Sequence, residues 1–261
     1  MKTFLLGAKY SMIDRWKAVR YFWLDYSAWI FVWPVVTFFM WYFLGKVVGS
    51  VSDIQDYGAF VITGTMTWTF MSRGFRKVQH KINQEFERKR LAYIYVTPSS
   101  RLGYFFGFSL FEFLRGLIDA SILIFLMFLF GMNVNFNVLM LVLMFLLSWF
   151  SLIGMSYIFS GINLMLGRIE AITEVAFEML RLVSGVFYPI TVLPGFLQSF
   201  SKLLPPYYAV EGVRKVMLEN ATLIDVLPEI SILFIFGVIT LFLGSWMIKK
   251  GENQIKKEGL L

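Results

Sequence analysis

The segment RGFRKVQHKINQEFERKRLAYIYVTPSSR, residues 73–101, decides how the rest of the chain is arranged. It is polar, it carries eight Lys and Arg residues against two Glu residues, and it stands between two long apolar runs. Lys and Arg residues next to membrane spans are retained on the cytoplasmic side. The segment therefore indicates a cytoplasmic loop, in which residues 84–95, free of Pro and Gly, are expected to form a short helix that ends at Thr97 and Pro98.

The composition of the whole chain is that of a membrane protein. Of the 261 residues, 58% are hydrophobic and 16% are charged, whereas soluble domains have about 45–50% apolar and about 25% charged residues. We predict an all-α polytopic membrane protein whose residues 1–261 form one transmembrane domain. The net charge of +7 comes from Lys and Arg residues that lie mainly in segments predicted to be cytoplasmic. Because membrane topology accounts for this charge, nucleic acid is not an expected partner. With no Cys and with His80 alone, no metal site is expected.

Six runs are long enough to cross a bilayer, which takes about 20 predominantly apolar residues. The predicted spans are residues 25–48, 57–71 (continuing to 75 at most), 102–130, 138–166, 169–188 and 229–248. With this topology, 18 of the 24 Lys and Arg residues lie in inner segments and four lie in outer loops. That bias predicts a multi-pass protein of the cell membrane with both termini in the cytoplasm.

Two further segments are expected at the membrane surfaces. Residues 1–22 mix aromatic and aliphatic residues with five Lys and Arg residues, a pattern typical of a helix that lies in the membrane interface. In residues 189–228, prolines separate apolar pieces of about ten residues. Such pieces are too short to span, and they fit re-entrant or interfacial helices on the outer side.

Two of the predicted spans carry charges at helical spacing. A charge at mid-membrane costs at least about 2.5–3.5 kcal/mol, so each should find a partner or water. Arg115 is expected to pair with the acidic residues on its own span, and Arg181 with Glu178. These charged residues either line a pathway and contact substrate, or relay protons, or form an ion-paired network that fixes helix register. They are Glu112, Arg115, Asp119, Glu174, Glu178 and Arg181.

Three motifs, taken in order on this six-span plan, are similar to those of a known family. They are QEFERKRLAYIYVTPSSRLGYFFG (residues 84–107), SGVFYPITVLP (residues 184–194) and LLPPYYAVEGVRKVML (residues 203–218). The chain resembles the transmembrane subunit of a type-2 ABC exporter over essentially its whole length. One departure is the stretch Leu91-Ala92-Tyr93-Ile94, where the family commonly has Gly-Thr-Leu-Glu.

The resemblance implies a dimer with a second copy or a homologous permease, embedded in membrane lipids and driven by a separate ATPase subunit. The chain has no phosphate-binding loop, so ATP and Mg would be bound by that partner and no cofactor by this chain. The implied substrates are a polysaccharide, a glycolipid, a lipid or an amphipathic drug. The implied coupling helix, which contacts the ATPase, contains Gln84, Glu85, Phe86, Glu87, Arg88 and Arg90. The implied extracellular gate contains Tyr188, Pro189, Leu193 and Pro194.

Two other functions stay open on the residues alone. The first is a membrane-embedded enzyme that acts on lipid-linked substrates through Glu112, Asp119, Glu174 or Glu178 as acid or base. The second is a purely structural or assembly subunit. The exporter hypothesis differs from both because it requires an ATPase partner and predicts no ATPase activity for this chain alone.

Overall fold

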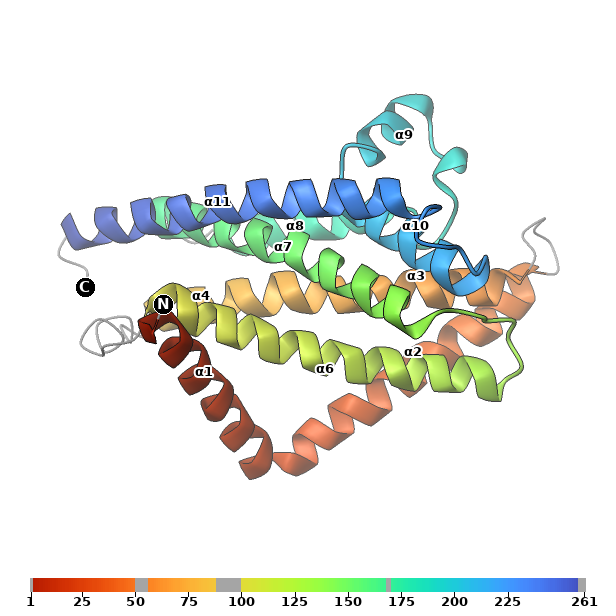
Figure 1. The fold of residues 1–261 in the computed structure, drawn as a ribbon, viewed down its shortest axis with the longest axis horizontal. Coiled ribbons are helices and arrows are strands. Elements are labelled where there is room, and N and C mark those ends of the chain that lie inside the picture. The colour runs from red at the N-terminus through yellow and green to blue at the C-terminus, as the bar shows by residue number, and fades with distance from the viewer. Residues whose placement is uncertain (1, 50–55, 88–99, 168–169, 258–261) are drawn as a thin grey trace.

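The computed structural model of the chain describes residues 2–49, 56–87, 100–167 and 170–257. They form a bundle of long helices, with both termini at the end where α4 also lies, and with a short helical excursion near the opposite end (Figure 1). The elements in order are α1 (Lys2–Tyr21), α2 (Trp23–Gly49), α3 (Tyr57–Ser72), η1 (Arg73–Lys77), α4 (Val78–Glu87), α6 (Arg101–Leu129), α7 (Val138–Leu166), α8 (Glu170–Val183), η2 (Ile190–Val192), α9 (Gly195–Ser201), α10 (Pro205–Leu218) and α11 (Leu227–Lys257).

The helical fold class is confirmed, whereas the count of six spans stays a prediction. Within the described ranges, three helical segments are both long and apolar enough to cross a membrane: Tyr26–Gly49, Val138–Leu166 and Leu227–Gln254. The helix α6 has 29 residues but carries three charges near its middle. The helices α3 and α8 have 16 and 14 residues, which at 1.5 Å per residue is less than a bilayer core of about 30 Å.

The helix that contains the second predicted span continues past residues 71 and 75, where the sequence analysis ended that span, and the end of the span itself stays a prediction. The helix α3 passes into η1, a π-helix, and then into α4 without leaving the bundle, so the helical path runs from Tyr57 to Glu87. The physical reason is a second apolar stripe, because Phe75, Val78 and Ile82 recur at helical spacing and are all buried. The first half of the basic segment is therefore helical and packs on the bundle, and its cytoplasmic location stays a prediction.

Two other boundaries also differ from the prediction. The helix α8 ends at Val183, before the expected residue 188, where Gly185 adopts a positive φ of 73° in the following turn. The helix α11 continues to Lys257, past the expected residue 248. It continues because Gly251 in its polar extension lies against Leu164 of α7, so the extension still has a surface to pack on.

Glycines let α7 and α11 approach closely along their length. Gly154 and Gly161 of α7 are seven residues apart, as are Gly237, Gly244 and Gly251 of α11. A Cβ atom at any of these positions would overlap the facing helix. Small residues at this spacing permit helix contact inside a membrane, where the hydrophobic effect supplies no association force. The sequence analysis did not identify this seam, although its seven-residue period was readable.

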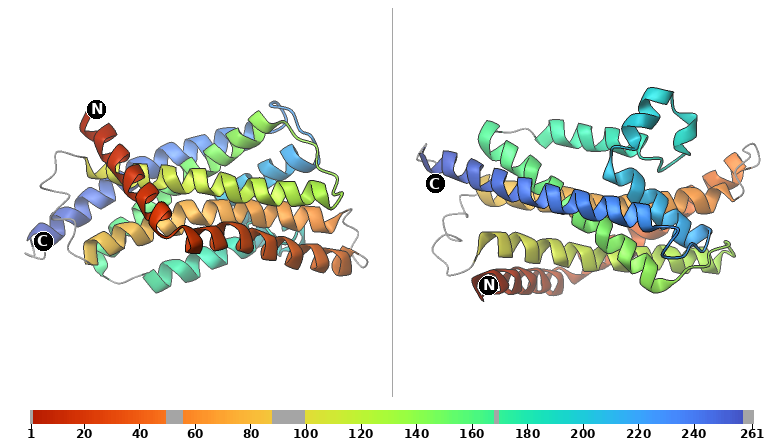
Figure 2. Two further views of the ribbon diagram at one scale, coloured as in Figure 1. Left: turned by 90° about the horizontal axis from the view of Figure 1, so that it is seen from below. Right: turned by 45° about the horizontal axis from the view of Figure 1, so that its top comes forward.

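A second close contact joins α1 to α6, and it uses the two glycines at the end of the first motif, Gly103 and Gly107. A Cβ at Gly103 would overlap the backbone of Phe4, and a Cβ at Gly107 would overlap the backbone of Ala8. Seen from below, α1 crosses the beginning of α6 at an angle (Figure 2, left panel). The N-terminal helix is thus fixed to the bundle, and its location at a membrane surface stays a prediction.

The region between α8 and α11 consists of short helices, as the spacing of its prolines predicts. The helix α10 packs against α3, α7 and α11, and its Ala209, Val210 and Val213 are buried. The elements η2 and α9 project from the bundle (Figure 1), with Val192 and Phe196 exposed.

We expect Gly154→Ala to destabilise the subunit. The added methyl would overlap Thr240 and the backbone of Leu241 in α11. Backbone atoms of α11 can move away from this methyl only if α11 separates from α7. Overpacking of this kind costs about 1–3 kcal/mol, against a gain of about 1 kcal/mol in helix propensity. The measurement is the apparent melting temperature of the detergent-purified protein.

Gly195→Ala is the matched control, because a Cβ at Gly195 meets no atom within 4 Å. An unchanged melting temperature for Gly154→Ala would contradict the glycine seam.

Candidate functional site

Charged residues of α6 and α8 meet at η1. This π-helix has one wide turn, a feature frequently found at functional sites. Its Arg73 forms an ion pair with Asp119 of α6. Its Arg76 forms ion pairs with Glu178 and, at 3.3 Å, with Glu174 of α8. The basic segment therefore supplies the cations that hold the two acidic helices.

The expected pairing of Arg115 is wrong in part. Asp119 pairs with Arg73, from another helix, rather than with its neighbour Arg115 on α6. The guanidinium of Arg115 lies 5.0 Å from the centre of the Tyr26 ring. Glu112 is buried, and its Oε2 has no hydrogen-bond partner within the described part of the chain. The expected Arg181–Glu178 pair is confirmed at 3.0 Å.

Aromatic stacking reinforces the attachment of α8. The ring of Phe177 lies 4.4 Å from Phe75 and parallel to it, and 4.6 Å from Trp68. One helical turn away, the side-chain amide of Gln79 donates a hydrogen bond to Thr173 Oγ1 at 2.9 Å. The residues that make these contacts and the Arg76 ion pairs all belong to the continuous stretch from α3 through η1 to α4. This stretch therefore holds α8 against the bundle.

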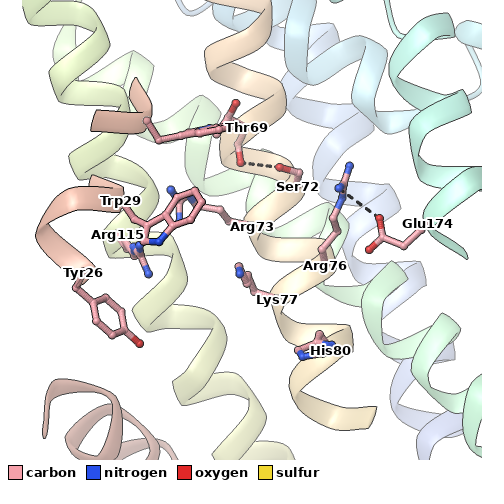
Figure 3. A pocket seen from close by; sticks show the side chains of 11 residues that line it. Tyr26, Trp29, Thr69, Ser72, Arg73, Arg76, Lys77, His80, Arg115 and Glu174 are labelled. Carbon is pink, nitrogen blue, oxygen red and sulfur yellow. Dashed lines mark hydrogen bonds and ion pairs between the residues drawn. The ribbon is translucent and has the colours of Figure 1, made fainter. Parts of the chain in front are cut away.

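An open cavity of about 630 Å³ lies beside this network. Figure 3 shows Tyr26 and Trp29 of α2 on one side, Glu174 of α8 on the other, and the cationic side chains between them. The cationic or titratable basic residues of its lining are Arg73, Arg76, Lys77, His80 and Arg115, and Glu174 is its acidic residue.

Among the residues expected in the coupling helix, the structure describes the surroundings of two side chains, those of Gln84 and Glu85. Gln84 is half-buried, and Glu85 is only 4% exposed and pairs with Lys81. Phe86 and Glu87 form the end of α4, and Arg88 and Arg90 lie outside the described residues. The carboxylate of Glu85 is occupied within the subunit, so an external contact would fall on the residues after it.

The four expected gate residues come together in the excursion. The Tyr188 hydroxyl donates a hydrogen bond to the carbonyl of Leu182 at 2.8 Å. Pro189 and Pro194 immediately precede η2 and α9, and the carbonyl of Leu193 accepts a hydrogen bond from Gln198 at 2.8 Å. Their role as a gate stays a prediction.

Arg214 of α10 makes contacts at this end of the bundle that the sequence analysis did not predict. Its guanidinium lies 3.5 Å from the centre of the Phe60 ring and donates hydrogen bonds to the carbonyls of Phe60 and Val186. Gly64 makes room for it, because a Cβ there would overlap both Val186 and Arg214. Nearby, Lys215 donates a hydrogen bond at 2.8 Å to Glu229, and this bond raises the pKa of Lys215.

We expect Arg73→Gln and Asp119→Asn each to destabilise the subunit strongly. Each change leaves the other member of a buried pair without its counter-charge, which costs roughly 3–5 kcal/mol. The double variant should lose less than the sum of the two single losses, because it leaves neither charge alone. Thermal unfolding of the four proteins measures this coupling.

Lys17→Gln removes an exposed charge on α1 and serves as the control. Strictly additive losses in the double variant would mean that Arg73 and Asp119 do not depend on one another.

Comparisons with known proteins agree with the motifs. The sequence profile of the family described as ABC-2 type transporter matches residues 4–218. A 63-residue segment is 35% identical to the linearmycin resistance permease protein LnrN of Bacillus subtilis (strain 168). The match covers 24% of this chain and 16% of that relative, so it spans a small part of both proteins. The family match covers most of the chain, from α1 through α10, and the chain therefore belongs to the ABC-2 type transporter family.

Proposed function

We propose that this chain is the membrane-spanning subunit of an ATP-driven exporter. Two copies, or one copy and a homologous permease, would form the translocation pathway, and a separate ATPase subunit would bind ATP and Mg. The substrate would be a polysaccharide, a glycolipid, a lipid or an amphipathic drug. Family membership and the permease named among the relatives support this proposal.

The observation that carries the coupling is the unbroken helical path from Tyr57 to Glu87. Its 31 residues would extend over roughly 45 Å, from the inner end of the bundle to the level of Arg214. Midway it holds α6 through Arg73 and α8 through Arg76. A displacement applied at the Glu87 end would therefore move two other helices, and one helix would transmit the work of a partner ATPase to the pathway.

The faces left open by the subunit support a partner within the membrane. On α2, Trp29, Phe31 and Met40 are exposed, and on α8, Val175 and Met179 are exposed. The cavity opens between these two helices. A second permease subunit on this side would enclose the cavity between two subunits, whereas membrane lipid would cover the remaining apolar surface.

The carboxylates do not favour an enzyme. Asp119, Glu174 and Glu178 each form an ion pair with an arginine. These carboxylates are thus occupied by arginines within the subunit. No observation specifically supports acid–base chemistry at these residues, and we propose none.

The proposed topology predicts opposite labelling of the two ends of the bundle. Because the chain has no Cys, Ser199→Cys in α9 and Arg90→Cys after α4 each provide a single thiol. On intact cells, a membrane-impermeant maleimide should label Ser199→Cys and should label Arg90→Cys only after permeabilisation. Labelling of Arg90→Cys from outside would overturn the cytoplasmic location of the basic segment.

The coupling proposal predicts loss of ATPase binding on charge reversal at Arg88→Glu together with Arg90→Glu. These positions follow the buried Lys81–Glu85 pair, so the change spares the helix that holds the bundle. Co-purification of a co-expressed ABC ATPase, and ATP hydrolysis by the complex in proteoliposomes, should fall at least about tenfold, the effect of about 1.4 kcal/mol.

Lys17→Glu together with Arg20→Glu on the exposed side of α1 is the control for a general change of charge, and it should retain the ATPase. Equal retention by both double variants would contradict the assignment of the coupling contact.

A further inference from the structure

The cavity between α2 and α8 has an unusual combination of walls. At about 630 Å³ it falls in the size range of small-molecule sites, which is roughly 300–1,000 Å³. One wall is aromatic and lies on the surface of the subunit, since Trp29 and Trp33 of α2 are 60% and 51% exposed. The opposite wall is the basic surface of η1 and the start of α4.

The basic wall retains positive charge after the internal ion pairs are accounted for. Arg73 and Arg76 are paired with carboxylates. Lys77 and Arg115 also line the cavity, and neither forms a salt bridge with any described residue. His80 adds a hydrogen-bond donor at the edge. An anion in the cavity would therefore find Lys77 without a carboxylate partner among the described residues, and Arg115, on whose charge Glu112 and Asp119 of α6 act without forming a salt bridge to it, with the paired arginines close by.

The local geometry brings these groups to one place. The π-helix directs Arg73 to α6 and Arg76 to α8, and Lys77 stands exposed between those two attachments. Figure 3 shows Arg115 approaching the same space from α6, next to Arg73. Guanidinium and ammonium groups that converge in this way suit an anion with several oxygens, above all a phosphate.

The position of the cavity indicates that its ligand also has an apolar part. The lining of the cavity comes from the first turns of α2, from the path through η1 into α4, and from Arg115 in the middle of α6. Tryptophan rings prefer the level of the lipid headgroups. A molecule with its charge on the basic wall would lay its apolar part along Trp29 and Trp33 and outward into the membrane.

We infer that this cavity binds a phosphate-bearing amphiphile, with the phosphate on Lys77 and Arg115 and the apolar chain along Trp29 and Trp33. This inference rests on the proposed function and narrows its substrate class: the molecule accepted from the inner half of the membrane carries a phosphate. The same chemistry is found in a lipid headgroup and in free phosphate, and the aromatic wall favours the former.

The test is a binding titration of the full-length subunit in detergent, without ATPase or ATP, followed by tryptophan fluorescence. Three probes separate the contributions: dioctanoyl phosphatidic acid, dioctanoylglycerol with the same chains and no phosphate, and inorganic phosphate. Phosphatidic acid should bind at least about tenfold more tightly than either other probe, as expected for one lost charged contact. Trp29→Phe together with Trp33→Phe should remove most of the fluorescence change.

Two double variants locate the phosphate. Lys77→Gln together with Arg115→Gln should weaken the binding of phosphatidic acid at least about tenfold. Lys17→Gln together with Arg20→Gln removes the same charge from the exposed side of α1, and should leave binding within about twofold. Arg115→Lys keeps the charge and should retain most of the binding, which separates loss of the anion contact from loss of folding.

Three outcomes would overturn the inference. Equal binding of dioctanoylglycerol would show that the phosphate is not recognised. Inorganic phosphate binding as tightly as phosphatidic acid would show a site for a free anion. Equal loss in both double variants would show a general surface effect. Because this titration contains no ATPase, its failure is distinct from a failure of the coupling experiment.

Discussion

The need to neutralise charge within a bundle of apolar helices constrains the part of this protein around η1. Asp119 on α6 and Glu178 on α8 would each be costly if left alone in a low-dielectric setting, and both are neutralised from one element, η1. The pairing fixes α6 and α8 in register with the helix that carries Arg73 and Arg76. Nonspecific packing of Phe, Leu and Met permits sliding, whereas an ion pair between two helices does not.

Glycines complement this constraint where charge is absent. Along α7 and α11 the helices approach at Gly154, Gly161 and Gly244, and no ion pair joins them within the described segments. The bundle therefore has two differently built parts. The α7–α11 pair is held along its length by close backbone contact, and α8 is held mainly by the ion pairs and rings of one neighbouring helix. A displacement of α3, η1 and α4 would move α8 far more readily than it would separate α7 from α11.

Much of this fold was readable from the sequence, and the failures have a common cause. The bounds of α2, α6 and α7 follow from apolar runs with clear ends, and α7 was predicted to the residue. The continuation of α3 was missed because its charged residues were assigned to solvent, although Phe75, Val78 and Ile82 mark a buried stripe among them. Pairing partners within one helix were considered first, so Arg115 was assigned to Asp119. Only the arrangement of helices in space shows that Arg73, 46 residues away in the chain, reaches it instead.

The same basic residues thus serve two constraints that a sequence alone does not separate. Lys and Arg residues near a span determine its orientation, and this statistical role explains why so many lie between residues 73 and 101. In the structure, Arg73 pairs with the buried Asp119 and Arg76 with the partly exposed Glu178, while Lys77 and Arg115, which form no salt bridge with the described residues, line the cavity beside an aromatic wall. Topology needs only the number of positive charges on one side of the membrane. Their distribution around η1, with some paired and some free, is more specific than topology requires, and it is this distribution that gives the cavity its preference for an anion.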